Sequence, residues 1–86
     1  MALLMVVRMI TSRQIRAARA LLGWSQQQLA DKAIVSVNAL ARLERGEVDP
    51  RMSTLTAVHK AFNEAGVEFL AADVKGEGVR LTDPMG

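Results

Sequence analysis

The sequence predicts one small, mainly α-helical domain: four short helices followed by a C-terminal β-hairpin. Hydrophobic residues recur at helical spacing through most of the 86-residue chain, and capping residues or glycines separate the segments. After Gly66 the spacing changes to that of two short strands. Half of the residues are hydrophobic but only three are aromatic, which is typical of a helical core built from Leu, Val, Ile and Ala.

Each of the four helices is predicted from its start and stop signals. The first covers about 12–22, because Thr11 and Gln14 match a capping box and Gly23 can adopt the left-handed conformation that ends a helix. The other three are predicted over about 26–32, 37–45 and 52–65. A serine stands in the capping position before the second and the third helix, and a loop precedes the fourth.

The C-terminal segment is predicted to form two strands, 67–70 and 78–81, joined by a turn at 73–78. Two strands alone are marginal in water, so a further strand is expected beside them. The apolar residues 3–7, from the same chain or a second copy, are one candidate, and a disordered extension is the alternative. The expected divisions are an N-terminal extension or strand (1–10), a helical domain (11–66) and a hairpin with its tail, expected to serve dimerisation (67–86).

Charge differs between the two parts of the chain. From Arg8 to Lys60 nine basic residues stand against four acidic ones, a net charge of +5. From Ala61 onward two basic residues stand against five acidic ones, a net charge of −3. Because positive charge attracts phosphates, the helical part is the expected nucleic-acid face.

The chain lacks the residues that several classes of function require. There is no cysteine, hence no disulfide framework or thiolate metal site, which fits a reducing cytoplasm. His59 is the single histidine, with no carboxylate or thiol at ligand spacing, so we expect a surface role for it. Glycine-rich phosphate loops, paired carboxylates and serine–histidine arrangements are absent. We therefore expect neither enzyme activity nor a cofactor or metal. The apolar residues 1–10 are too short to cross a bilayer, so no membrane partner is expected.

The most informative segment runs from Trp24 to Gly46, where two short helices are joined by a three-residue turn: W-S-Q-Q-Q-L-A-D-K-A-I-V-S-V-N-A-L-A-R-L-E-R-G. The second helix is predicted to expose a narrow face consisting of Val37, Asn38, Ala41, Arg42 and Arg45. Such a face fits the major groove, where Asn pairs with adenine, Arg pairs with guanine and Val meets the thymine methyl group. Asn38 and Arg42 are four residues apart and project together. The alternative is a solvated surface without a ligand.

Residues 10–62 resemble the Cro/phage-repressor family of helix-turn-helix regulators, also called XRE-like, which have the lambda-repressor-like fold. The matching residues are S-Q-x-x-L-A at 25–30, S-x-x-x-L-x-R-L-E-R-G at 36–46, and Pro50 before the next helix. The resemblance implies that Val37, Asn38 and Arg42 contact bases. It also implies that Gln26, at a helix N-terminus, holds a DNA phosphate. Further phosphate candidates are Ser36, Arg45 and Arg51, for which a plain cap and two exposed arginines are the alternative.

The resemblance also assigns structural roles and marks departures. Arg19 and Glu44 correspond to an ion pair that packs the first helix against the end of the third. Ile34 stands where the family usually has glycine in a left-handed turn, so strain is expected there. The acidic residues Glu47 and Asp49 lie in a loop expected near phosphates, where they would weaken DNA binding unless Asp49 caps the fourth helix.

Together these features predict a cytoplasmic, sequence-specific transcriptional regulator that binds double-stranded DNA as a homodimer. We expect it to act as a repressor. It would bind a roughly palindromic operator through the recognition helix at 36–45. One alternative is the antitoxin of a toxin–antitoxin pair, which would bind DNA and also a toxin as protein partner. The other is a protein-interaction module on the same fold.

Overall fold

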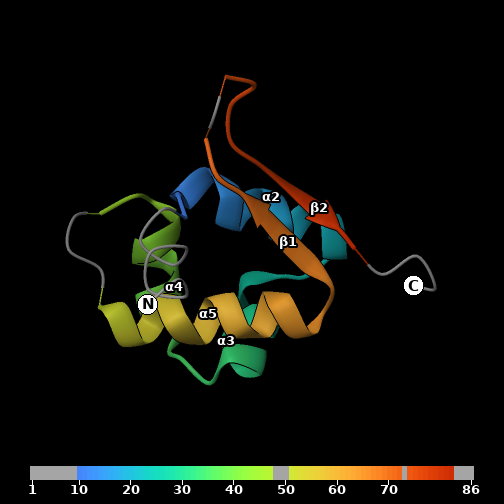
Figure 1. Cartoon of the computed structure of the whole chain (residues 1–86). Helices are drawn as coiled ribbons and strands as arrows, with labels where there is room; N and C mark the ends of the chain where they lie inside the picture. The colour runs from blue at the N-terminus through green and yellow to red at the C-terminus, as the bar shows by residue number, and fades with distance from the viewer. Residues whose placement is uncertain (1–9, 48–50, 73, 83–86) are drawn as a thin grey trace.

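The computed structural model describes residues 10–47, 51–72 and 74–82, and there it shows four helices around one core with a hairpin across them (Figure 1). The elements are α2 (Ser12–Leu22), α3 (Gln26–Ala33), α4 (Val37–Glu44), α5 (Met52–Glu64), β1 (Val67–Leu70) and β2 (Gly78–Leu81). The predicted mainly helical fold with a C-terminal hairpin is thereby confirmed. The candidate strand at 3–7 lies outside the described residues.

The first three helices begin at their predicted caps. The side chains of Thr11, Ser25 and Ser36 each accept a hydrogen bond from the backbone N–H three residues later. In α2 and α3 the capping box is complete, because a glutamine side chain also reaches back to the cap. Helix α5 begins after Arg51 without a side-chain cap, and Asp49 lies outside the described residues.

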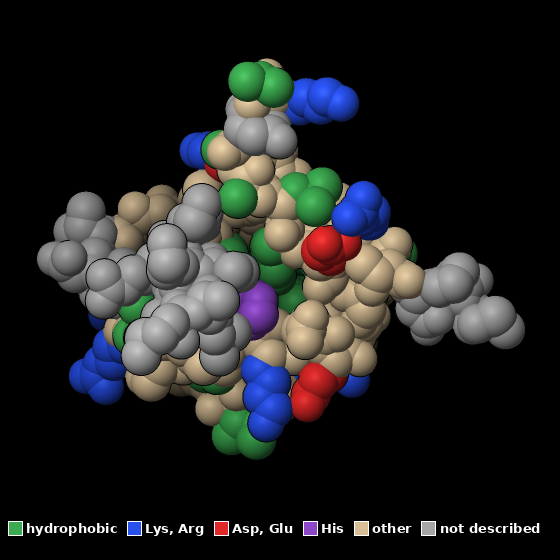
Figure 2. All heavy atoms as spheres, in the orientation of Figure 1, with side chains coloured by type: hydrophobic (Ala, Val, Ile, Leu, Met, Phe, Trp, Pro, Cys, Tyr) green, Lys and Arg blue, Asp and Glu red, His purple; other side chains and the backbone are tan. Residues whose placement is uncertain are grey.

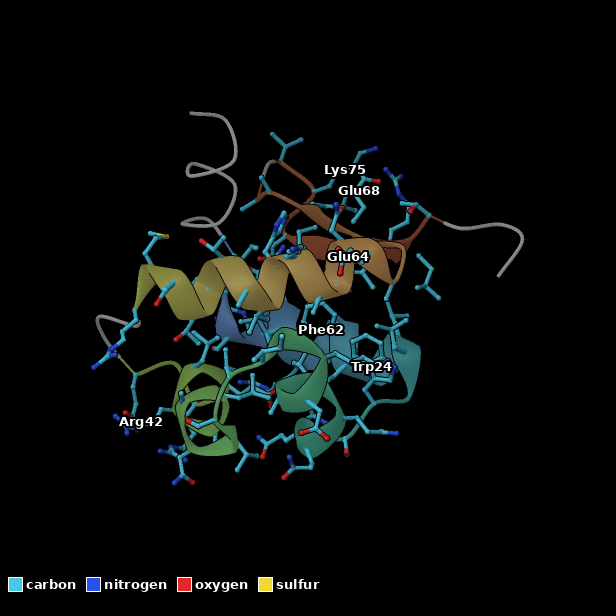
Figure 3. All side chains as sticks on the ribbon, turned by 90° about the horizontal axis from the view of Figure 1, so that it is seen from below. Trp24, Arg42, Phe62, Glu64, Glu68 and Lys75 are labelled. Carbon is cyan, nitrogen blue, oxygen red and sulfur yellow. The ribbon has the colours of Figure 1, made fainter. Side chains whose placement is uncertain are left out.

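The core is apolar and draws on every helix and on β1. Its buried residues are Ile15, Ala18, Leu29, Ala30, Ala33, Leu40, Leu43, Leu55, Val58, Ala61, Phe62 and Val67. Phe62 of α5 is fully buried, and the Trp24 ring stacks on it at a centroid distance of 5.8 Å (Figure 3). The Phe69 ring meets Phe62 edge-on at 5.7 Å. The aromatic rings therefore join α5 to the hairpin and to the loop before α3.

His59, expected on the surface, is half-buried. Its ring lies 5.8 Å from the Phe69 ring, and Figure 2 shows the histidine beside a group of hydrophobic side chains. Burial lowers the pKa of His59, because the charged imidazolium loses hydration there. The side chain is only partly exposed because β1 folds back over α5, which places Phe69 against a helix position that the sequence alone leaves open.

The hairpin is held by α2 of its own domain. Its strands pair antiparallel, with Val67 opposite Leu81 and Phe69 opposite Val79. The buried Gln14 side chain donates from Nε2 to the carbonyl oxygens of Leu70 and Gly78, at 2.9 Å each. These bonds and the packing of Val67 and Phe69 on the core stabilise a two-stranded sheet that would be marginal alone.

The turn before β2 is also tied to the start of α2. Glu77 accepts hydrogen bonds from Thr11 Oγ1 at 2.9 Å and from Arg13 Nε at 2.8 Å. The Arg13 guanidinium, with help from Thr11, lowers the pKa of the Glu77 carboxyl. The pair between Arg13 and Glu77 is largely exposed, so it contributes little to the free energy of unfolding. Its role is to position the turn before β2 against the start of α2.

Replacing Gln14 by alanine is expected to lower the free energy of unfolding by about 2 kcal/mol, because two carbonyls and one cap lose their partner. The matched control is Gln28→Ala in α3, which removes an equivalent capping-box glutamine that is exposed and has no bond to another element. Its expected loss is about 0.5–1 kcal/mol. Urea unfolding of both variants measures the difference, and equal losses would contradict the bridging role of Gln14.

The turn between α3 and α4 contains a strained residue. Ile34 has φ 57° and ψ 51°, the left-handed conformation, and its side chain is 90% exposed. A β-branched residue pays about 1–2 kcal/mol for this conformation. Because so little of the Ile34 side chain is buried, packing does not offset the strain.

Ile34→Gly is therefore expected to raise the free energy of unfolding by about 1 kcal/mol, since glycine removes the strain but adds freedom to the unfolded chain. Thermal and urea unfolding would measure the gain. Ile34→Ala serves as the control, because alanine keeps the Cβ atom that causes the strain. A loss of stability in the glycine variant would show that the isoleucine side chain makes a stabilising contact.

Candidate nucleic-acid interface

The candidate interface is the exposed side of α4. The buried side of this helix consists of Leu40, Leu43 and Glu44, which hold it against the core. On the other side Asn38 and Arg42 are exposed, and Figure 3 shows Arg42 directed away from the molecule. Val37 is half-buried and packs against the core, so only part of its side chain faces solvent.

The polar ends of Asn38 and Arg42 have no protein partner. Within the described residues neither side chain makes a hydrogen bond or an ion pair. The two positions are one helical turn apart, so both side chains project from the same strip of α4. An amide with free donor and acceptor and a free guanidinium are the groups that pair with adenine and guanine in the major groove.

A buried network fixes the far end of α4. Arg19 Nε donates to Glu44 Oε2 at 2.8 Å and Arg19 Nη2 donates to Glu44 Oε1 at 3.0 Å, a bidentate pair in which the Glu44 side chain is only 3% exposed. A third Arg19 nitrogen donates to the carbonyl of Trp24 at 3.0 Å. This network connects α2, the start of α3 and the last turn of α4, so it sets the orientation of the candidate recognition helix.

The candidate phosphate residues differ in their availability. Gln26, in the first turn of α3, uses its side-chain Nε2 to donate to Glu44 Oε1 at 3.1 Å. Ser36 caps α4 with its hydroxyl, and Arg45 forms an exposed pair with Glu47 at 2.8 Å. Arg51 is exposed at the start of α5 and has no partner among the described residues. Arg51 is thus the readiest of the four to meet a phosphate.

Sequence reasoning missed Arg16. Its Nη1 donates to the main-chain carbonyl of Glu44, the last residue of α4, where helix carbonyls lack partners. Arg16 and Arg19 are three residues apart on α2 and share one face, which is the signal in the sequence. This spacing predicts a contact with α4 only once α4 is known to end against this face of α2.

The described residues contain no cluster of His, Cys, Asp and Glu that could hold a metal ion. Among these residues, too, no helix is long and apolar enough to pass through a membrane.

Two short helices joined by a tight turn, the second with an exposed polar strip and a buried inner side, define a helix-turn-helix DNA-binding domain. The sequence profile of the helix-turn-helix family matches residues 15–69. The chain belongs to this family, in its Cro/C1 or XRE-like type, and so to a class of DNA-binding transcriptional regulators that are generally not enzymes.

A curated relative is the competence pilus inhibition repressor of Acinetobacter baylyi (strain ATCC 33305 / BD413 / ADP1). It is 36% identical over 73 residues, which cover 83% of this chain. The matched part spans 66% of that relative's length. No solved structure matches the chain.

Proposed function

We propose that this chain is a sequence-specific transcriptional repressor that binds a roughly palindromic operator as a homodimer, with α4 in the major groove. The observation that carries the proposal is the unpartnered polar strip of Asn38 and Arg42 on a helix whose other side is fixed in the core. The name of the related protein, a repressor, favours repression.

In the proposed complex Arg42 donates two hydrogen bonds to guanine and Asn38 pairs with adenine. Val37 meets a thymine methyl group with the exposed part of its side chain. These contacts select the sequence, whereas phosphate contacts set the position of the protein on the duplex. Arg51 and the backbone N–H groups at the start of α3 supply the phosphate contacts, and Arg45 joins them by exchanging Glu47 for a phosphate.

The homodimer follows from the small number of base contacts. Three side chains on one helix select only a few base pairs, so a second copy is needed to double the sequence information. A two-fold dimer reads two inverted half-sites, hence the palindrome. We place the protein in the cytoplasm, with DNA, and assign it no catalytic activity or cofactor; occupation of a promoter is sufficient for repression.

The test is selection of duplexes from a random library by the full chain, followed by sequencing. The expected result is one enriched motif with two inverted half-sites, and binding that weakens as salt rises. Failure to enrich any motif at low salt would contradict the proposal and favour a protein-interaction module. Enrichment of a single unrepeated half-site would keep sequence-specific binding but reject the dimer.

A further inference from the structure

Two of the large hydrophobic side chains left exposed by the fold come from neighbouring elements. Leu21, at the end of α2, is 45% exposed, and Leu81, at the end of β2, is 46% exposed. The other two exposed large hydrophobic residues among those described, Ile34 and Val74, lie in turns. The leucines are therefore the pair that belongs to regular secondary structure.

Hydrogen bonds at the start of β2, together with the lengths of α2 and β2, place the two leucines at the same end of the α2–β2 contact. Glu77 is bound at the start of α2, and Gln14, further along α2, donates to the Gly78 carbonyl, so β2 and α2 run in the same direction. From Gly78 to Leu81 the strand advances about 10 Å. From Gln14 to Leu21 the helix also advances about 10 Å, and seven residues bring it back to the same face. Figure 1 shows β2 lying along α2.

The strand beside these leucines has an open edge. β1 pairs with one edge of β2 and rests on α5, whereas β2 rests on α2, so the outer edge of β2 faces away from β1. Among the described residues no other strand pairs with that edge. Edge strands commonly carry unpaired charges that discourage pairing, but Arg80 of β2 is neutralised by Glu68 of β1, with Nε 3.0 Å from Oε1.

We propose that a second copy of this chain docks on the surface formed by Leu21, Leu81 and the outer edge of β2, here called the α2–β2 edge. The two β2 strands pair antiparallel around a two-fold axis. This proposal rests on the homodimer of the proposed function and adds its location. A two-fold interface needs the same surface on both copies, and the α2–β2 edge presents a strand and an apolar pair that complement themselves.

Charge and geometry favour a second copy as the occupant. Because Arg80 is already paired within its own hairpin, two identical strands can approach without like-charge repulsion. On α2 the residues that bind α4, Arg16 and Arg19, lie more than a quarter turn from Gln14 and Leu21. Docking at the α2–β2 edge thus leaves Asn38 and Arg42 uncovered for DNA.

The first test uses the absence of cysteine, which makes single-cysteine cross-linking unambiguous. Arg80→Cys, Leu81→Cys and Thr82→Cys variants of the full chain are oxidised without DNA and compared with Val74→Cys. Val74 lies in the turn of the same hairpin and is fully exposed. At least one of the three β2 positions is expected to form a disulfide-linked dimer, since residues near the axis bring their Cα atoms within about 7 Å. Equal cross-linking at Val74, or none in β2, overturns the proposal.

The second test is sedimentation of wild type, Leu81→Glu and Val74→Glu. Leu81→Glu is expected to raise the dimer dissociation constant at least about tenfold, whereas Val74→Glu, with the same change of charge, leaves it unchanged. A monomeric wild type, or a dimer that tolerates Leu81→Glu, overturns the α2–β2 edge.

A random duplex at low salt separates this proposal from the proposed function. A Leu81→Glu monomer that still binds this duplex supports both. A wild type that cross-links through β2 but binds no duplex would keep the dimer surface and reject the DNA-binding function.

Discussion

Replacing Glu44 by alanine is expected to lower the free energy of unfolding by about 3 kcal/mol, the largest effect of any single substitution considered. The carboxylate accepts two hydrogen bonds from Arg19 and one from Gln26. Its removal leaves the Arg19 guanidinium without a counter-charge where that side chain is only 23% exposed. The value is at the lower end for breaking a buried pair, because the exposed part of Arg19 keeps some hydration.

Urea unfolding measures this loss directly, and a fall in Tm of about 12–24 °C should accompany it in a domain of this size. Glu47→Ala is the matched control. Glu47 also pairs with an arginine at 2.8 Å, but both side chains are exposed, so the expected change is below about 1 kcal/mol. If the two variants lose similar stability, burial does not increase the contribution of the Arg19–Glu44 pair to the free energy of unfolding.

Replacing Arg42 by alanine is expected to cost about 1–3 kcal/mol of discrimination between the selected operator and a random duplex. The Arg42 guanidinium is exposed and has no partner in the described structure, so its removal leaves the fold intact. The loss should concentrate on a guanine in each half-site. Binding titrations with operator, random duplex and guanine-substituted operator measure it.

Arg51→Ala provides the contrast. Arg51 is also an exposed arginine, but it lies at the start of α5, outside the strip on α4. As a phosphate contact it should weaken binding to both duplexes alike and reduce the salt slope by about one. If the Arg42 and Arg51 variants lose the same discrimination, Arg42 does not contact bases.

Local signals in the sequence predicted the helices closely. Thr11, Ser25 and Ser36 each start a helix, and Gly23 ends α2 in the left-handed conformation. Caps and glycine stops act within one turn of the chain, so neighbouring residues suffice to recognise them. The left-handed backbone at Ile34 was expected from the family resemblance and not from the residue itself, because a β-branched side chain disfavours this conformation.

The candidate interface could be predicted in part. The spacing of Asn38 and Arg42 against Leu40 and Leu43 suffices to place the first two on the solvent side of α4. The partial burial of Val37 could not be foreseen, because it depends on how closely the neighbouring core approaches the start of α4.

The sequence by itself thus determined the helix boundaries, the hairpin and the exposed strip on α4, all of which depend on residues close together in the chain. Only the tertiary structure decided that Gln14 holds the hairpin and that Arg16 binds the end of α4, and it left Leu21 and Leu81 exposed on two neighbouring elements. The hydrogen bonds of Gln14 and Arg16 join residues 28 to 64 positions apart, and their partners are fixed by the packing of α2 against α4 and the hairpin. Periodicity shows which face of an element is buried, but not which polar groups of the neighbouring elements that face will contact.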